Sequence, residues 1–175
     1  MAEGKKVYSV ELQEKILQEA TDLIAKRHDS DSSVLGIYLG GSAIDGTFGE
    51  YEKPVEHGTE PRMGSDIDVG LVIKDRRGPM LLSEEEQKHY GVRHIGKTEE
   101  IPVYRAVDEK GQDILLHDKH PIEYMILTKH IFEGRLSGKY QWDSDRSRPF
   151  AERVKESRIL KETEELKNIR EKYTR

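Results

Sequence analysis

The stretch YLGGSAIDGTFGEYEKPVEHGTEPRMGSDIDVGLVI, residues 38–73, places a Gly-Gly-Ser turn and an Asp-Ile-Asp triplet at the ends of a polar insertion. The residues before the turn, 34–39, form a compact apolar run, which is typical of a buried strand. Gly40 and Gly41 end this run. We therefore expect a strand, a glycine turn and a second strand, which together decide the fold.

The second strand, over residues 66–73, alternates between two kinds of side chain. Successive side chains of a strand point to opposite faces. One face carries Ile67, Val69, Leu71 and Ile73, and the other carries Asp66, Asp68 and Gly70. The apolar face is expected to lie in the core, so that the opposite face presents two carboxylates.

The two aspartates point to a particular chemistry. Side chains at positions i and i+2 of a strand share a face, with their Cα atoms roughly 7 Å apart. Without a counter-charge the two carboxylates would repel each other. Two divalent ions about 3.5–4 Å apart would neutralise them, as in two-metal phosphoryl and nucleotidyl transfer. Because all the ligands are oxygens, we predict two Mg²⁺ ions, with Mn²⁺ as the alternative.

The turn Gly40-Gly41-Ser42 supplies a complementary function. Glycines let the backbone come close to a polyanion, and amides at the start of a helix can bind phosphate oxygens, as can a serine hydroxyl. The turn is therefore predicted to hold a triphosphate that the metals activate.

The remaining elements follow from periodicity and capping residues. Helices are predicted over residues 9–28, from Ser83 toward Tyr90, over 129–135, and from Pro149 to near the C-terminus. A hairpin is predicted over residues 101–107 and 113–116 with Gly111 in its turn, and a further strand over residues 121–128. The predicted fold is α/β (α+β), a mixed β-sheet with helices packed mainly on one face and a C-terminal helix. We expect one domain over residues 1–130 and a charged helical extension over residues 131–175.

Composition excludes several classes of protein. Of the 175 residues 34% are apolar and 36% are charged, and no run approaches the ~20 apolar residues of a membrane span. The N-terminus lacks the apolar segment of a signal peptide, so a cytoplasmic location is expected. There is no cysteine, so any metal must be held by oxygen or histidine. A net charge of −5 argues against a nucleic-acid-binding surface.

The apolar strand, Gly40-Gly41-Ser42 and Ser65-Asp66-Ile67-Asp68-Val69 resemble the signature of the DNA polymerase beta-like nucleotidyltransferase superfamily. Its small, minimal and antibiotic-adenylylating members are the most similar, and the resemblance covers roughly residues 34–128. It implies transfer of a nucleoside monophosphate to a hydroxyl acceptor, with release of pyrophosphate. By analogy with the family, this nucleoside monophosphate is expected to be AMP, taken from ATP.

The resemblance also implies roles for residues at matching positions. Asp66 and Asp68 would be metal ligands, and a third carboxylate on a neighbouring strand would complete the site and take the acceptor's proton. Glu123 is the candidate for that third carboxylate, with Asp113 as the alternative. The residues implied in nucleotide binding are Gly40, Gly41, Ser42 and Ser65. Candidates for further phosphate contacts are Lys74, Arg76, Arg77, Lys129 and Arg135.

The sequence departs from the family pattern in the insertion. Ala43-Ile44-Asp45 stands where Ala-Arg-Gly is common, so an arginine is missing, and the interval up to Asp66 is longer than usual. The insertion reads either as a surface loop or as a lid ordered by substrate. His117 and His120 are three residues apart, but they are interpreted as surface or core histidines rather than metal ligands.

Two other functions remain open. A non-catalytic module of the same fold, resembling an antitoxin, would bind nucleotide or a partner without turnover. A nucleic-acid polymerase or tRNA-end-adding enzyme fits the chemistry but not the acidic composition. Because the chain is too short for a large acceptor domain, we expect the acceptor to be held across a homodimer interface or supplied by a partner protein.

Overall fold

The computed structural model describes residues 4–57, 60–99 and 101–175, with side chains described outside residues 55–62. The strands are β1 (Lys5–Val7), β2 (Val34–Gly40), β3 (Gly49–His57), β4 (Glu60–Gly64), β5 (Ile67–Ile73), β6 (Val92–Thr98), β7 (Ile101–Ala106), β8 (Leu115–Leu116), β9 (His120–Thr128) and β10 (Arg158–Glu162). The helices are α1 (Val10–His28), α2 (Ser42–Asp45), α3 (Glu84–Tyr90), α4 (Lys129–Leu136), α5 (Asp143–Ser147), α6 (Phe150–Glu156) and α7 (Glu164–Thr174). The α/β fold class and the C-terminal helix are confirmed. No described helix is both long and apolar enough to cross a membrane.

The main sheet is mixed and has the strand order β10-β2-β5-β9-β7-β6, with β8 paired to β9. Strands β5 and β9 run parallel, and the other pairs along this order are antiparallel. Their parallel register sets Asp68 beside Glu123, and the antiparallel register of β2 sets Gly40 beside Asp68. Three segments far apart in sequence therefore meet at one place on the sheet.

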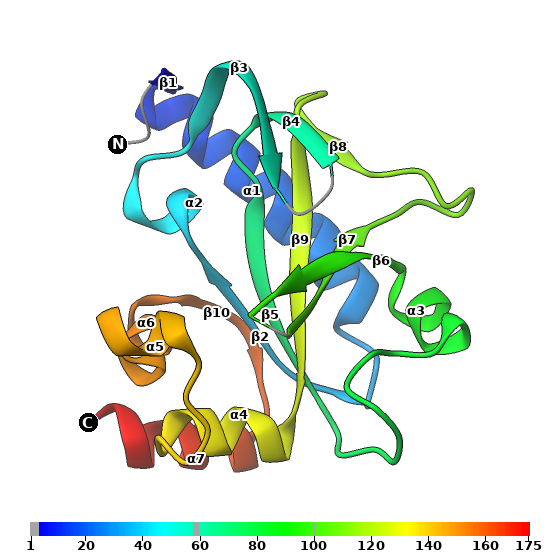
Figure 1. Ribbon diagram of the computed structural model, residues 1–175, viewed down its shortest axis with the longest axis vertical. Helices are drawn as coiled ribbons and strands as arrows, with labels where there is room; N and C mark the ends of the chain where they lie inside the picture. Colours follow the sequence, from blue (N-terminus) through cyan, green and yellow to red (C-terminus); the bar gives the residue numbers. More distant parts are fainter. Residues whose placement is uncertain (1–3, 58–59, 100) are drawn as a thin grey trace.

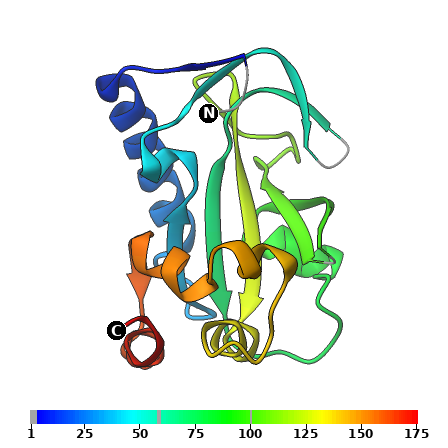
Figure 2. The ribbon, with the colours of Figure 1, turned by 60° about the vertical axis from the view of Figure 1, so that its left-hand side comes forward.

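Apolar side chains cover both faces of this sheet. The inward face of β5 packs with α1 in one cluster that includes Ile16, Ile24, Val69 and Leu71. On the other face Val72 and Leu127 pack with residues of α4, α6 and α7. The helices thus flank the sheet on two faces, whereas the sequence placed them mainly on one; Figure 2 shows the α5–α6 segment, in orange, crossing the strands away from α1.

Local capping signals are confirmed in the structure. The Ser9 side chain accepts a hydrogen bond from the Leu12 amide at 3.3 Å and begins α1. Ser83 and Glu86 form the expected capping box at the start of α3. These ends were readable because each depends on residues three positions apart.

The predicted helix from Pro149 to the C-terminus is wrong in its middle. α6 ends at Glu156, and Ser157 takes an extended conformation that leads into β10. β10 pairs antiparallel with β2 and so adds an edge strand to the main sheet (Figure 1). Its pairing partner lies more than a hundred residues earlier, which explains why local apolar spacing did not reveal it.

The predicted hairpin over residues 101–116 is also only partly correct. Gly111 has a φ of 78° in the turn, and one bridge joins Val107 to Asp113. However, β7 pairs with β6 and β9, and β8 pairs with β9. The strand that forms a hairpin with β7 is therefore β6, which the sequence did not indicate.

The insertion between the turn and the aspartates is not the irregular loop that was one of the expectations. Its strands β3 and β4 form a three-stranded sheet with β1, in the order β1-β3-β4. The Ser65 amide donates to the Gly49 carbonyl at 2.9 Å, which joins the two ends of this hairpin next to Asp66. The insertion therefore brings the chain back to the start of β5.

Candidate active site

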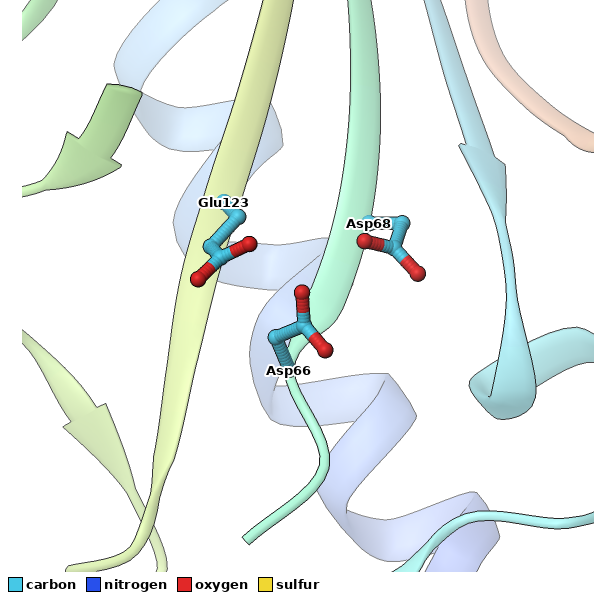
Figure 3. A group of neighbouring side chains, drawn as sticks. All are labelled: Asp66, Asp68 and Glu123. Carbon is cyan, nitrogen blue, oxygen red and sulfur yellow. The ribbon is translucent and has the colours of Figure 1, made fainter. Parts of the chain in front are cut away.

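Three carboxylates gather where β5 and β9 lie side by side. Asp66 immediately precedes β5, Asp68 is on β5, and Glu123 is on β9 (Figure 3). Each offers an oxygen that lies within 4.8 Å of the oxygens of the other two. Asp66 and Glu123 are 9% and 5% exposed, whereas Asp68 is exposed to solvent. The structure thus brings Glu123 to the aspartates, and Asp113 is not part of this group.

The donor set suits a hard divalent cation. All three groups are carboxylates, which are ligands of the kind that Mg²⁺ and Mn²⁺ prefer. Three negative charges at this spacing, two of them buried, repel one another unless a cation lies nearby. The residues present therefore fit the metal site that the sequence predicted.

The Gly-Gly turn packs directly on this group. Gly41 has a φ of 70°, which glycine adopts freely and other residues rarely do. A β-carbon at Gly41 would overlap the Asp68 carboxylate, so no side chain fits there. Ser42 follows as the half-buried first residue of α2. The turn and the carboxylates, which are distant in sequence, thus form one continuous surface.

Arg105 lies behind Glu123 and fixes it. The two residues are cross-strand partners on β7 and β9, and the guanidinium donates to Glu123 Oε1 at 3.3 Å. The other side of the guanidinium donates to Asp113 Oδ2 at 3.1 Å. Burial lowers the pKa of Arg105, but the hydrogen bonds to Asp113 and Glu123 outweigh it, so the pKa is raised overall. Arg105 therefore stays charged and orients Glu123, and Asp113 supports it from behind.

Ser65 occupies a structural position beside the site. It is 2% exposed, and its hydroxyl accepts a hydrogen bond from the Gly49 amide at 3.3 Å. Its carbonyl accepts one from Nδ1 of His120 at 2.8 Å. His120 is fully buried against Phe48 and Tyr8. His120, which the sequence interpreted as a surface or core histidine, is thus a core residue that anchors the residue preceding Asp66.

A cleft of about 600 Å³ opens over the exposed side of this group. Gly40, Gly41, Asp68 and Glu123 line one end. The opposite wall is formed by the α5–α6 region, including Arg148, Phe150 and Arg153. Arg148 pairs with Glu156, and Arg153 pairs with Asp145.

The cations expected from sequence do not line this cleft. Among the described residues, Arg76 pairs with Glu86, Lys129 with Glu165 and Arg135 with Asp145. The arginines that do line it, Arg148 and Arg153, were not predicted as site residues. Their only sequence signal was a basic stretch in the C-terminal segment, which could equally be a solvated helix face.

No protein-family model matches this sequence, and no curated protein matches it significantly, so its functional assignment depends on the geometry of the site.

Proposed function

We propose that the protein is a Mg²⁺-dependent nucleotidyltransferase of the DNA polymerase beta-like type that transfers AMP from ATP to a hydroxyl acceptor. The observation that supports this most strongly is the meeting of Asp66, Asp68 and Glu123 within 4.8 Å beside the Gly40-Gly41 turn. A carboxylate group alone would be ambiguous, since acidic clusters are common. Its contact with a turn whose second residue, Gly41, can only be glycine adds the phosphate-binding half.

In this proposal each residue has a distinct role. Asp66, Asp68 and Glu123 would hold Mg²⁺, and Mn²⁺ could replace it. The bound ions would lower the pKa of the acceptor hydroxyl and stabilise the leaving pyrophosphate. Gly40 and Gly41 would let backbone amides approach the phosphates. Glu123, oriented by Arg105, would accept the hydroxyl proton.

The reaction is an in-line displacement. The acceptor oxygen forms a bond to the α-phosphorus of ATP, the bond from that phosphorus to the bridging oxygen breaks, and pyrophosphate leaves. The acceptor can be a small molecule or a protein, held by a second copy of this chain or by a partner. A cytoplasmic location is part of the same proposal.

Calorimetric titration of ATP in the presence of Mg²⁺ tests the binding half. We expect Mg²⁺-dependent binding in the wild type and its loss in the Asp66→Asn/Asp68→Asn double variant. Asp45→Asn is the control, because it removes one carboxylate charge from the cleft lining without altering the three grouped carboxylates. A wild type that binds no ATP would overturn the proposal.

A second measurement separates an enzyme from a binding module. ATP labelled at the α-phosphate should transfer its label to an acceptor in a pool of hydroxyl compounds and proteins, with release of pyrophosphate. Binding of ATP without either event in any pool would favour the non-catalytic module instead.

A further inference from the structure

Beyond the carboxylates, the floor of the cleft is formed by glycine. Along one face of β5, Asp68 is exposed, Gly70 is half-buried and Val72 is buried. Gly40 lies beside Asp68 in the sheet, and Gly70 lies beside Tyr38. The face therefore changes from charged to apolar within four residues, and Gly70 marks the last uncovered position before the core.

The space above this floor is not used by the fold. A β-carbon at Gly40 would meet nothing within 4 Å, and one at Gly70 would meet only Tyr38 at 3.8 and 3.9 Å. Neither glycine has a positive φ. Because larger residues would fit the backbone at both positions, the glycines leave open a volume that side chains could have filled.

The walls beside Gly70 are apolar and well fixed. Tyr38 stacks on Phe132, with ring centroids 5.4 Å apart, and donates its hydroxyl proton to Glu162 at 2.8 Å. On the other side Met125 is the neighbour of Gly70 in β9, and its sulfur accepts a hydrogen bond from Arg135 at 3.3 Å. Phe150 of α6 also lines the cleft, and its ring packs edge-on against Phe132 with centroids 5.8 Å apart.

We propose that the part of this floor where Gly70 and Met125 lie side by side binds a planar ring, and that the ring is the base of the nucleotide whose phosphates lie at Gly40 and Asp68. The inference rests on the proposed function and names the place of the base within that site. Gly70 lies roughly 7 Å from Asp68 along the strand, a span that a ribose can bridge. A flat ring can lie close to peptide groups that carry no β-carbon, and methionine sulfur makes favourable contacts with ring edges.

The test compares two ligands that share phosphates and differ in the ring. Wild type and Gly70→Leu are titrated with ATP and with tripolyphosphate, each with Mg²⁺. We expect Gly70→Leu to lower affinity for ATP about tenfold or more and to leave affinity for tripolyphosphate unchanged. Gly70→Ala should give a smaller loss for ATP, because it fills less of the space.

Two controls separate blocked space from damaged structure. Met125→Leu keeps the floor apolar and nearly the same size but removes the sulfur, so it should lower ATP affinity by less than Gly70→Leu does and leave tripolyphosphate affinity unchanged. Thermal unfolding of Gly70→Leu should begin no lower than in the wild type, because glycine weakens strands.

Each remaining outcome counts against the assignment. Unchanged ATP affinity in Gly70→Leu overturns the assignment. This is also the result expected if the floor binds a ring of the acceptor instead of the base of ATP. Equal losses for ATP and tripolyphosphate also overturn it, because the effect would then reach the phosphates. A wild type that binds neither ligand removes the proposed function itself, whereas a wild type that binds both equally well removes only the ring site.

Discussion

Two buried arginines of this protein have opposite charge surroundings. Arg105, on β7, is shared by two acids, Asp113 and Glu123. Arg135, on α4, shares one acid with a second arginine, since Asp145 pairs with both Arg135 and Arg153. The two are 4% and 3% exposed, so burial alone does not distinguish them.

The excess charge in each place is balanced differently. The Arg135 guanidinium lies between the rings of Trp142 and Phe150, 3.7 and 3.9 Å from their centroids. Aromatic faces attract cations, so they offset the extra positive charge here. Burial still lowers the pKa of Arg135 to about 10, although Asp145 opposes this, whereas the pKa of Arg105 is raised.

The balance of acids and cations therefore differs between the two ion pairs: the pair at Arg135 is structural, whereas the pair at Arg105 lies beside the candidate site. Around Arg135 the protein completes its own charge balance and holds the C-terminal segment over the cleft. Around Arg105 a second cation, Arg93, also pairs with Asp113, but two more carboxylates lie next to Glu123, so the acids still outnumber the cations. Such an acidic excess is suited to an additional cation, as the proposed function requires.

The largest expected effect is that of Asp145→Ala. The substitution leaves Arg135 buried without its acid, which should cost about 3–5 kcal/mol in the free energy of unfolding. A guanidinium does not lose its proton near neutral pH, so urea unfolding at pH 5 and pH 8 should show the same loss. Asp143→Ala is the control, because this acid is 81% exposed in its side chain and should cost little. A loss near that of the control would show that Arg135 needs no counter-ion.

Arg105→Met should cost about 3 kcal/mol at pH 8 but less at pH 5. Without the guanidinium, Glu123 is a buried carboxylate that takes up a proton more readily in the folded chain than in the unfolded one. A folded state that binds more protons gains stability as the pH falls. A loss as independent of pH as that of Asp145→Ala would show that Glu123 does not become a buried unpaired acid when Arg105 is removed.

Neither arginine titrates between pH 7 and 5, so the acid sensitivity of the wild type is assigned to buried histidines. Burial, reinforced by Arg27, lowers the pKa of His28 to about 4. The unfolded chain then binds protons that the folded chain does not, so this contribution is present above pH 6.5 and is lost as the pH falls toward 4. The loss amounts to about 2 kcal/mol at pH 5.

The measurement for this effect is the free energy of unfolding against pH in the wild type and in His28→Gln. The slope between pH 7 and 5 should be shallower in the variant. It should not vanish, because burial also lowers the pKa of His120. An unchanged slope would contradict the assignment to His28.

The smallest effect is expected for Arg93→Ala. Arg93 donates to Asp113 at 2.8 Å, but its side chain is 40% exposed and Asp113 keeps Arg105 as a partner. Ion pairs of this kind contribute about 0–1 kcal/mol. The measurement is the free energy of unfolding in urea, compared between Arg93→Ala and Arg105→Met. An equal loss in both variants would show that Arg105 stabilises the fold through Asp113 and not through Glu123.

The sequence alone was enough for the features that depend on neighbouring residues. Alternation along β5 placed Asp66 and Asp68 on one face because a strand repeats every two residues. Ser9 and Ser83 marked helix starts because capping acts over three residues. The same local logic led to the erroneous long C-terminal helix, in which β10 could not be recognised without its partner β2.

Only the tertiary structure decided how these pieces combine. The parallel register of β5 and β9 selected Glu123 over Asp113, and the pairing of β7 with β9 placed Arg105 behind it. The fold of the C-terminal segment brought Arg148 and Arg153 over the cleft, and the glycine floor exists only because β2 and β5 lie side by side. The placement of two acidic residues, two positions apart, on one face of a strand was thus determined by the sequence. The third carboxylate and the surrounding cleft depend on hydrogen bonds between distant strands, which no local pattern encodes.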